Sequence, residues 1–169
     1  LKAFPYKEGY SLYIGIPFCP STCLYCSFTS YSIDQFENIV QDYLEALLKE
    51  LDFVAKTYAH KELQTMYIGG GTPTSLKEED LEYLLYEVNK RFPFSKIQEI
   101  TVEAGRPDSL NFEKLKILKK YGVTRISINP QSMNDKTLKL IGRNHFAQDI
   151  KEKFNLARQA GIDNINMDM

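Results

Sequence analysis

The three cysteines of this 169-residue chain lie close together, and their spacing is the most chemically informative feature of the sequence. Cys19, Cys23 and Cys26 follow one another in the pattern C-x3-C-x2-C. They come just after an apolar run, residues 12–16, whose composition predicts a short buried strand. Thiolates are soft ligands that bind zinc, copper(I) or iron–sulfur clusters. The segment therefore predicts a metal site on a loop at the end of a strand.

The number of ligands separates the candidate metals. A closed structural zinc site takes four protein ligands. The only histidines, His60 and His145, are distant from the cysteines in sequence, and neither belongs to a Cys/His pair at zinc-finger spacing. Three thiolates on a cubane cluster leave one iron open for a small molecule, much as catalytic zinc keeps an open position. The count favours an iron–sulfur cluster, while a zinc site and a chance group of buried cysteines stay as alternatives.

Segments typical of strands and of helices alternate along the chain. Strands are expected at residues 12–16, 65–68, 99–103, 125–129 and 164–169. Helices are expected over 33–54, from a capping box of Ser75 and Glu78 to about 88, and over 111–121, 134–142 and 147–160. Such alternation indicates an α/β fold of parallel βαβ units. The pattern alone does not choose between an open doubly wound sheet and part of a barrel.

Ligands of parallel α/β proteins bind at the carboxyl ends of the strands, so the residues that follow each predicted strand are site candidates. Besides the cysteines, these are Gly69, Gly70, Gly71, Thr72, Glu103, Gln131, Arg143 and Asp168. Glycines let a ligand approach the backbone, the arginine can hold a carboxylate, and the carboxylates can accept hydrogen bonds from an ammonium group or a ribose diol. Taken singly, each has a structural explanation, as a turn, a solvated carboxylate or a cation at a helix C-terminus.

Composition is that of an ordinary globular domain, with 43% hydrophobic and 25% charged residues. A net charge of −1 gives no electrostatic footprint for nucleic acid, and no apolar run approaches the roughly 20 residues that cross a membrane. An odd number of closely spaced cysteines does not suggest disulfides, so a reducing cytoplasmic location is expected. Because the chain starts without methionine and stops inside a predicted strand, we expect it to be a fragment of a longer protein.

The cysteine segment, with the aromatic Tyr25 directly before the last cysteine, resembles the signature of the radical S-adenosylmethionine (SAM) enzymes. In that family three thiolates hold a [4Fe-4S] cluster whose fourth iron chelates the amino and carboxylate groups of SAM. The resemblance implies that Cys19, Cys23 and Cys26 are the metal ligands and belong to the catalytic centre. It also implies a partial (β/α)6 barrel truncated at the fifth strand, with residues 1–169 as the N-terminal part of the core barrel.

The whole chain resembles one family in particular, the oxygen-independent coproporphyrinogen III oxidases, also called coproporphyrinogen dehydrogenases. The matching stretches are YIGIPFCPSTCLYCSF, YIGGGTPTSL, ITVEAGRPDSL, RISINPQSMNDKTLKLIGRNH and INMDM, and among the branches of the family they look most like HemZ. The resemblance implies contacts to SAM from Tyr13, Tyr25, Gly70, Gly71, Thr72, Glu103, Gln131, Arg143 and Asp168. Active oxidases of the family bind a second SAM, so the division of these residues between two SAM molecules stays open.

The implied reaction starts with one electron from a donor, which cleaves SAM to methionine and a 5′-deoxyadenosyl radical. The radical would remove hydrogen from propionate side chains of coproporphyrinogen III, and loss of carbon dioxide and an electron from each would leave the vinyl groups of protoporphyrinogen IX. Two departures from the family bear on this expectation. Gly15 stands where a histidine is usual, and Phe28 stands where the best-understood oxidases have a further cysteine. The second trait is shared with a branch of haem chaperones without oxidase activity, so a haem-binding chaperone is the alternative.

Overall fold

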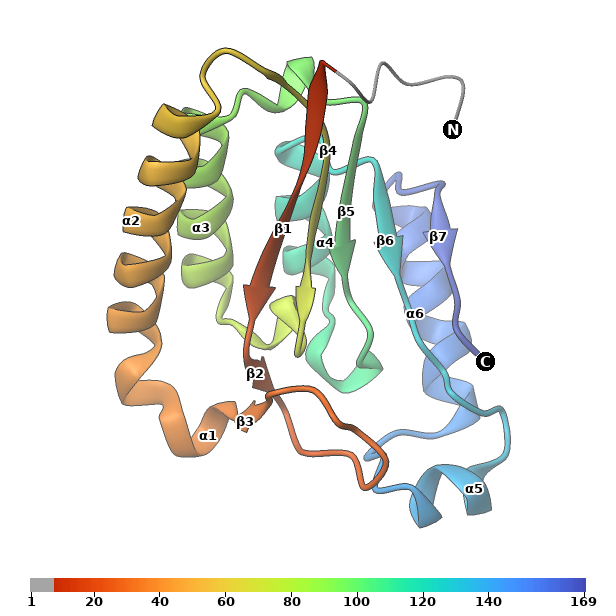
Figure 1. Ribbon diagram of the computed structural model, residues 1–169. Helices are drawn as coiled ribbons and strands as arrows, with labels where there is room; N and C mark the ends of the chain where they lie inside the picture. The colour runs from red at the N-terminus through yellow and green to blue at the C-terminus, as the bar shows by residue number, and fades with distance from the viewer. Residues whose placement is uncertain (1–7) are drawn as a thin grey trace.

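The computed structural model describes residues 8–169, whose central element is a five-stranded sheet (Figure 1). All neighbouring strands pair in parallel, in the spatial order β1-β4-β5-β6-β7, which is also their order in the chain. The strands are β1 (Gly9–Ile16), β4 (Glu62–Gly70), β5 (Glu99–Glu103), β6 (Arg125–Ser127) and β7 (Ile165–Asn166). The predicted parallel α/β fold is confirmed.

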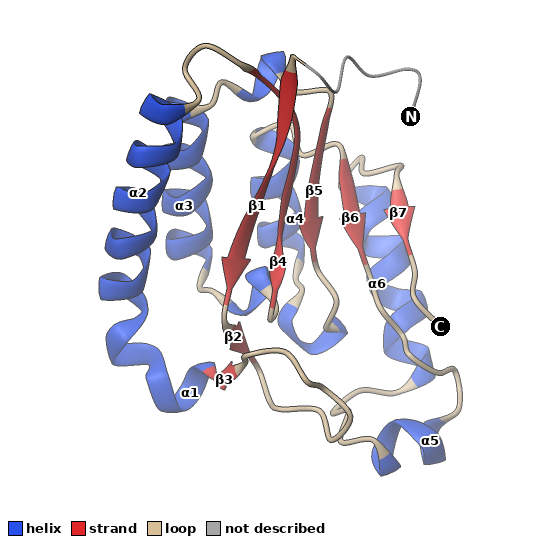
Figure 2. Ribbon diagram, viewed as in Figure 1, coloured by secondary structure: helices blue, strands red, loops and turns tan. Residues whose placement is uncertain are grey.

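The helices that follow the first four strands of the sheet include four that together cover one of its faces (Figure 2). They are α2 (Val40–Thr57), α3 (Glu78–Arg91), α4 (Phe112–Lys120) and α6 (Ala147–Gln159). Within residues 8–169 no helix covers the opposite face, and none is long and apolar enough to cross a membrane. A doubly wound sheet carries helices on both faces, whereas a barrel keeps them outside. The arrangement is therefore a partial barrel.

The two faces of the sheet differ in chemistry, because successive residues of a strand point to opposite sides. The residues that face the helices are aliphatic and buried, among them Ile14, Ile16, Met66, Ile68, Ile100, Val102 and Ile126. Burying each such side chain stabilises the fold by about 1.5–3 kcal/mol. The residues between them, on the open face, include Ser11, Tyr13, Thr65, Tyr67, Thr101, Glu103 and Ser127. Packing against the helices thus leaves the open face available for polar groups.

Several predicted helix ends are confirmed by their hydrogen bonds. Asn111 caps α4, and its side chain accepts a hydrogen bond from the amide of Lys114 at 2.9 Å. Asn134 caps the short helix α5 (Asp135–Leu140) by accepting from two of the amides that follow it. Gly122, just beyond α4, has a φ of 75°, the left-handed conformation that commonly ends a helix.

The prediction of a single long helix over residues 33–54 is wrong, because the chain bends within this range. Helix α1 (Ile33–Phe36) is followed by a 3-10 turn (Glu37–Ile39), after which α2 begins. At the bend Phe36 has a φ of −121°, and its ring packs edge-on against that of Tyr31, with centroids 5.0 Å apart. Apolar residues recur at helical spacing on both sides of the bend, so the sequence pattern does not reveal it.

The prediction of a capping box at Ser75 and Glu78 is also wrong. Ser75 ends a 3-10 helix (Pro73–Ser75), and its hydroxyl donates to the carbonyl oxygens of Phe18, at 2.9 Å, and of Thr72. Helix α3 starts at Glu78 without a side-chain cap. The hydroxyl instead joins the turn after β4 to the start of the cysteine segment.

The last two strands are shorter than expected. Strand β6 ends at Ser127 rather than at residue 129, and β7 covers two residues of the expected 164–169. Backbone pairing between them is limited to Ile126 with Ile165 and Ser127 with Asn166. Asp168 therefore follows the last strand instead of lying in it.

A second, two-stranded sheet was not expected. Strands β2 (Phe18–Cys19) and β3 (Tyr31–Ser32) pair in parallel at the two ends of the segment that carries the cysteines. Further 3-10 helices occupy Phe94–Lys96 and Pro107–Ser109 in the connections that precede and follow β5. Below, residues 19–31 are called the cysteine loop.

Candidate active site

A cavity of about 380 Å³ opens at the carboxyl ends of the strands, with the cysteine loop in its wall. Its lining includes nearly all of the predicted site residues, namely Cys19, Cys23, Tyr25, Cys26, Gly70, Gly71, Thr72, Glu103, Gln131, Arg143 and Asp168. These residues lie at or beyond the ends of five different strands of the main sheet. The parallel topology thus brings distant parts of the sequence to one place, where they can act on the same ligand.

Tyr13 and Gly69 are the predicted residues that this cavity does not include. The side chain of Tyr13 projects from β1 on the open face, is 60% exposed, and stacks on Tyr67 with ring centroids 5.8 Å apart. It lines a neighbouring cavity of about 250 Å³. The two cavities share Phe28, Gly70 and Gly71. Tyr13 therefore lies beside the main cavity rather than in its wall.

The cysteine loop is held at its ends by β2 and β3, and its residues 20–30 form neither helix nor strand. Its three thiols are free. The sulfur of Cys19 lies 3.4 Å from the hydroxyl oxygen of Thr72. Burial raises the pKa of the Cys19 thiol, while the bond to Thr72 and the charge of Arg106 act in the opposite direction. The loop thus presents its thiols beside a hydroxyl group and a cation.

The number of thiols bears on the choice between the metals left open by the sequence. Within residues 8–169, no three Cys, His, Asp or Glu side chains converge closely enough to hold a single metal ion. A closed structural zinc site takes four protein ligands, whereas the loop contributes three thiols. In a cubane cluster each thiolate binds a different iron atom, which keeps the sulfur atoms apart. Three free thiols in the wall of one cavity therefore fit a cubane cluster with one iron left open.

The glycine-rich turn after β4 packs directly against the start of the cysteine loop. The amide of Gly71 donates to the carbonyl of Ile16, and the amide of Thr72 donates to that of Phe18, each at 2.7 Å. A β-carbon at Gly71 would lie 2.6 Å from the Phe18 oxygen and 2.8 Å from the Ile16 oxygen. Only glycine fits at this position, and it leaves that part of the cavity wall as bare backbone.

Glu103 reaches from the end of β5 across the open face of the sheet. The hydroxyl of Tyr67 donates to its Oε1 at 2.6 Å, and the Gly70 amide also bonds to the carboxylate. A β-carbon at Gly69 would lie 2.8 Å from the Glu103 carboxyl carbon, so any larger residue on the neighbouring strand would displace the carboxylate. Burial raises the pKa of Glu103, although both hydrogen bonds act against this, and the charge of Asp168 adds to it. The result is a half-buried acceptor at the cavity wall.

Arg143, which follows α5, joins three parts of the wall. Its Nε and Nη2 donate to the Tyr25 hydroxyl at 3.2 and 2.9 Å, and its Nη1 donates to the Gly105 carbonyl at 3.2 Å. The amide of Leu24 donates to the carbonyl of Ile141 at the end of the same helix, at 3.1 Å. Burial raises the pKa of Tyr25, with the Arg143 bonds acting in the opposite sense. The arginine thus links the cysteine loop to the strand ends.

Gln131 and Asp168 close the side of the cavity formed by the last two strands. The Gln131 amide donates to the Asp168 carbonyl at 3.0 Å, and Gln131 has a φ of 64°, which is unusual for a residue with a side chain. The carboxylate of Asp168 accepts from the side chain of Asn166 at 2.9 Å. Asn129, also in the wall, has a buried side-chain oxygen without a hydrogen-bond partner among the described residues. These groups are polar and available to a ligand.

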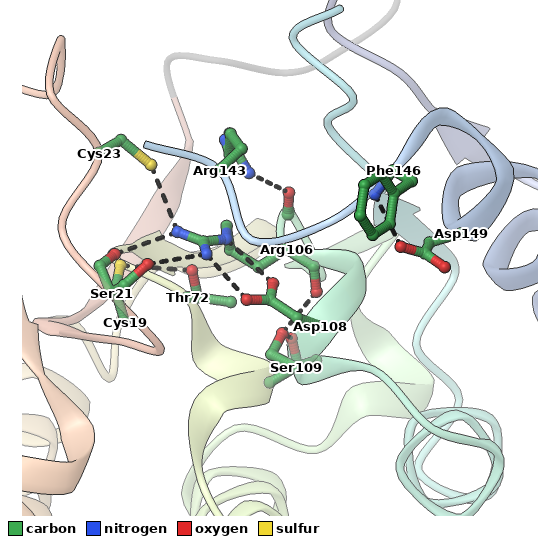
Figure 3. Close-up of polar contacts among 12 residues, drawn as sticks. Cys19, Ser21, Cys23, Thr72, Arg106, Asp108, Ser109, Arg143, Phe146 and Asp149 are labelled. Atoms are coloured by element: carbon green, nitrogen blue, oxygen red, sulfur yellow. Dashed lines mark hydrogen bonds and ion pairs between the residues drawn. The ribbon is translucent and has the colours of Figure 1, made fainter. Parts of the chain in front are cut away.

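Arg106 is the candidate that the sequence reasoning missed. It lies in the cavity wall with 3% of its side chain exposed, and its Nη1 donates to the sulfur of Cys23 at 3.3 Å (Figure 3). Its Nε and Nη2 donate to the two carboxylate oxygens of Asp108 at 3.0 and 2.8 Å. The turn GRPDS, which contains both residues, follows β5 directly. Applying the strand-end rule to the whole turn rather than to Glu103 alone identifies it.

Comparison with known proteins adds an independent observation. The sequence matches the Radical SAM superfamily over residues 13–169, a range that includes the three cysteines and every strand end at the cavity. The chain belongs to the radical SAM superfamily. Membership in this superfamily implies SAM and an iron–sulfur cluster as cofactors, which agrees with the thiols and the open cavity described above.

Two curated radical SAM relatives carry different functional names. The chain is 47% identical over 166 residues to the oxygen-independent coproporphyrinogen-III oxidase-like protein HemZ of Bacillus subtilis, covering 96% of this chain and 33% of HemZ. It is 45% identical over 161 residues to the heme chaperone HemW of the same organism, covering 94% of this chain and 41% of HemW. The chain thus spans well under half the length of these relatives.

A solved structure supports the same radical SAM fold. The coproporphyrinogen III oxidase HemN from Escherichia coli, described as a radical SAM enzyme, superposes with a TM-score of 0.83 at 28% sequence identity. The superposition covers 95% of this chain and 36% of HemN. The partial barrel implied by the sequence is therefore confirmed.

Proposed function

We propose that this chain is the N-terminal part of the core barrel of a radical SAM enzyme that decarboxylates coproporphyrinogen III. One observation carries the proposal, namely that residues from five strand ends and three free thiols meet in a single cavity of a radical SAM fold. The names of HemZ and HemN support coproporphyrinogen III as the substrate class. Removal of a hydrogen atom from each of two propionates, followed by loss of carbon dioxide and of one electron to an external acceptor, would give protoporphyrinogen IX. Three reduced thiols suit a cytoplasmic location.

In this proposal Cys19, Cys23 and Cys26 hold a [4Fe-4S] cluster, and SAM occupies the remainder of the cavity. When bound, the cluster and SAM supply electron transfer from an external donor and removal of a hydrogen atom from the substrate. The protein supplies position, because the ligands lie on a loop fixed between β2 and β3. It also limits access of water to the wall behind the loop, where Thr72 is 2% exposed and Arg106 is 3% exposed.

The methionine end of SAM is assigned to the glycine-rich turn and to Arg143. Gly70, Gly71 and Thr72 provide a wall of backbone that SAM can approach closely. In hydrogen bonds to described residues, Arg143 uses one N–H of each nitrogen, which leaves a donor on Nη1 and on Nη2 for a carboxylate. Glu103, a half-buried acceptor, suits the ammonium group of SAM.

The adenosine end is assigned to the opposite side of the cavity. Gln131 both donates and accepts there, and Asp168 can accept from a ribose diol. Tyr25, whose hydroxyl accepts from Arg143, lies between the two ends of SAM and contributes an aromatic ring. Tyr13 is assigned to the edge of the SAM site, because its cavity adjoins the main one at Gly70 and Gly71. The substrate then approaches from the open face of the sheet.

A second candidate function is haem binding without decarboxylation. Phe28 lies in the walls of both cavities, is 72% exposed, and occupies the position at which the best-understood oxidases have a further cysteine. An exposed aromatic ring suits the face of a porphyrin. The name of the HemW relative, a heme chaperone, supports this alternative.

The two functions are separated by assays on the full-length protein. We would reconstitute it with iron and sulfide without oxygen, reduce it chemically, and add SAM with coproporphyrinogen III. Formation of 5′-deoxyadenosine together with protoporphyrinogen IX is expected, and a variant with all three cysteines replaced by alanine is the control. Stoichiometric haem binding, with no decarboxylated product, would favour the chaperone. Absence of 5′-deoxyadenosine from a protein that holds its cluster would contradict the proposed enzyme.

A further inference from the structure

Arg106 uses every N–H of its guanidinium group within the protein. Nη1 donates to the Ser21 carbonyl at 3.1 Å and to the Cys23 sulfur at 3.3 Å, while Nη2 donates to the Ser21 hydroxyl at 3.0 Å and to Asp108 at 2.8 Å. Nε donates to the second oxygen of Asp108 at 3.0 Å. Because a guanidinium has one N–H on Nε and two on each terminal nitrogen, none is left for a ligand.

This saturation separates Arg106 from the other arginine of the wall. Arg143 retains N–H donors on both terminal nitrogens, whereas every N–H of Arg106 is hydrogen-bonded to the cysteine loop or to Asp108. Burial of a charged group is costly unless it is paired and hydrogen-bonded, and the 3% exposed Arg106 meets both conditions. Its contacts are therefore suited to holding the loop rather than to binding SAM.

The contacts of Arg106 fall on the part of the loop before Leu24 and Tyr25, which are held by Ile141 and Arg143. Residues 20–30 lie outside any helix or strand, and Arg106 binds both the backbone and the side chain of Ser21 as well as the sulfur of Cys23. Asp108 fixes the guanidinium plane through two parallel bonds, a rigid geometry that a lysine cannot reproduce. The pair thus connects the turn after β5 to the middle of the cysteine loop.

We propose that Arg106 is a positioning residue that sets the place of Cys23 and, through its charge and its N–H bond to that sulfur, raises the reduction potential of the cluster. The inference rests on the cluster proposed above. The potential of an iron–sulfur cluster depends on the net charge around it and on hydrogen bonds to its sulfur atoms. A cation stabilises the more negative, reduced cluster, and Asp108 offsets part of that effect. Removing the charge of Arg106 therefore lowers the potential, and removing the charge of Asp108 raises it.

The test is a redox titration of the full-length, reconstituted protein without SAM, followed by electron paramagnetic resonance. Arg106→Gln is expected to lower the midpoint potential and to retain less iron and sulfide, and Arg106→Lys is expected to restore part of both. Asp108→Asn, which keeps Arg106 beside Cys23, is expected to raise the potential. Arg91→Gln is the matched control, because Arg91 also binds both oxygens of an aspartate, Asp52, but outside this cavity.

The outcomes separate this proposal from the proposed function. Wild-type iron content and potential in Arg106→Gln would overturn the role of Arg106 while leaving the radical SAM chemistry intact. If Arg106→Gln holds no cluster, its potential cannot be compared, and the Asp108→Asn variant provides the test instead. An unchanged potential in Asp108→Asn would overturn the proposal. A shift of the potential in Arg91→Gln as large as that in Arg106→Gln would also overturn the proposal. A wild-type protein without a cubane signal would overturn the proposed function and this inference together.

Discussion

Gly71 and Glu103 stand at or just beyond the ends of hydrogen-bonded strands, whereas Cys23 and Cys26 lie in a loop without regular structure on the other side of the same cavity. The first side is fixed by the backbone pairing of the sheet and by packing of its aliphatic face on the helices. The second side is fixed by individual side chains, chiefly Arg106. Changes on the sheet side should therefore alter folding and SAM binding, and changes on the loop side should alter cluster binding.

The largest effect is expected from the loop side. Cys23→Ala in the full-length protein should abolish the cubane signal and 5′-deoxyadenosine formation, because two thiolates remain where the cluster needs three. Thermal unfolding of the metal-free protein should be almost unchanged, since this residue does not belong to the buried core. Iron and sulfide analysis together with circular dichroism checks both expectations. An intact cubane signal would contradict the ligand assignment.

On the sheet side the largest effect is expected from Gly71→Ala. The added methyl group would lie 2.6 Å from the Phe18 oxygen, so the backbone must move. Such overpacking costs about 1–3 kcal/mol, and it should also weaken the two hydrogen bonds that join the turn to the cysteine loop. Chemical denaturation of the full-length protein measures the loss. A stability equal to that of the wild type would show that the close approach of Gly71 to the Phe18 carbonyl does not require glycine.

A smaller effect is expected from Glu103→Gln, which keeps the size of the side chain and removes its charge. Loss of a charge-assisted hydrogen bond should weaken SAM binding by about tenfold, or ~1.4 kcal/mol, with the cluster signal retained. Isothermal titration measures the affinity, and Glu99→Gln, at the other end of β5, is the matched control. Equal effects of the two variants would argue against a role for Glu103 in the site.

The same carboxylate gives a prediction for the dependence on pH. Because burial raises the pKa of Glu103, it takes up a proton at a higher pH than an ordinary glutamate does. As the pH falls, the affinity of the wild-type protein for SAM should therefore decrease earlier than an ordinary glutamate would predict. Titrations of SAM at several pH values test this. A wild-type profile identical to that of Glu103→Gln would contradict it.

The smallest effect is expected from Gly15→Ala, at a position where the family usually has histidine. A β-carbon there meets only the Tyr13 ring, at the ordinary contact distance of 3.7 Å. Replacing a strand glycine reduces the entropy lost on folding, so stability should stay equal or rise by about 0.5 kcal/mol. Thermal unfolding of this variant beside Gly71→Ala compares an open glycine with a crowded one. A large loss of stability in Gly15→Ala would show that the open space at this strand is needed for the fold.

The sequence predicted the parts of the site that depend on topology. Once the strands were recognised as parallel, the residues after each had to meet, as Gly70, Glu103 and Asp168 do. It missed the parts that depend on contacts between distant side chains. The bend before α2 follows the packing of Phe36 on Tyr31, and the role of Arg106 depends on the path of the cysteine loop. Neither contact leaves a periodic signal in the sequence.

The agreement between strand order and chain order has a consequence for assembly during synthesis. Each new strand adds beside the strand made before it, so the sheet can grow one unit at a time from the N-terminus. The cysteines emerge first, but Arg106 and Arg143, which hold their loop, emerge much later. A ribosome-bound chain that carries only the first two strands of the sheet would therefore display its thiols on a loop held at its ends but without the contacts of Arg106 and Arg143. Cluster insertion is then expected to follow completion of the later strands.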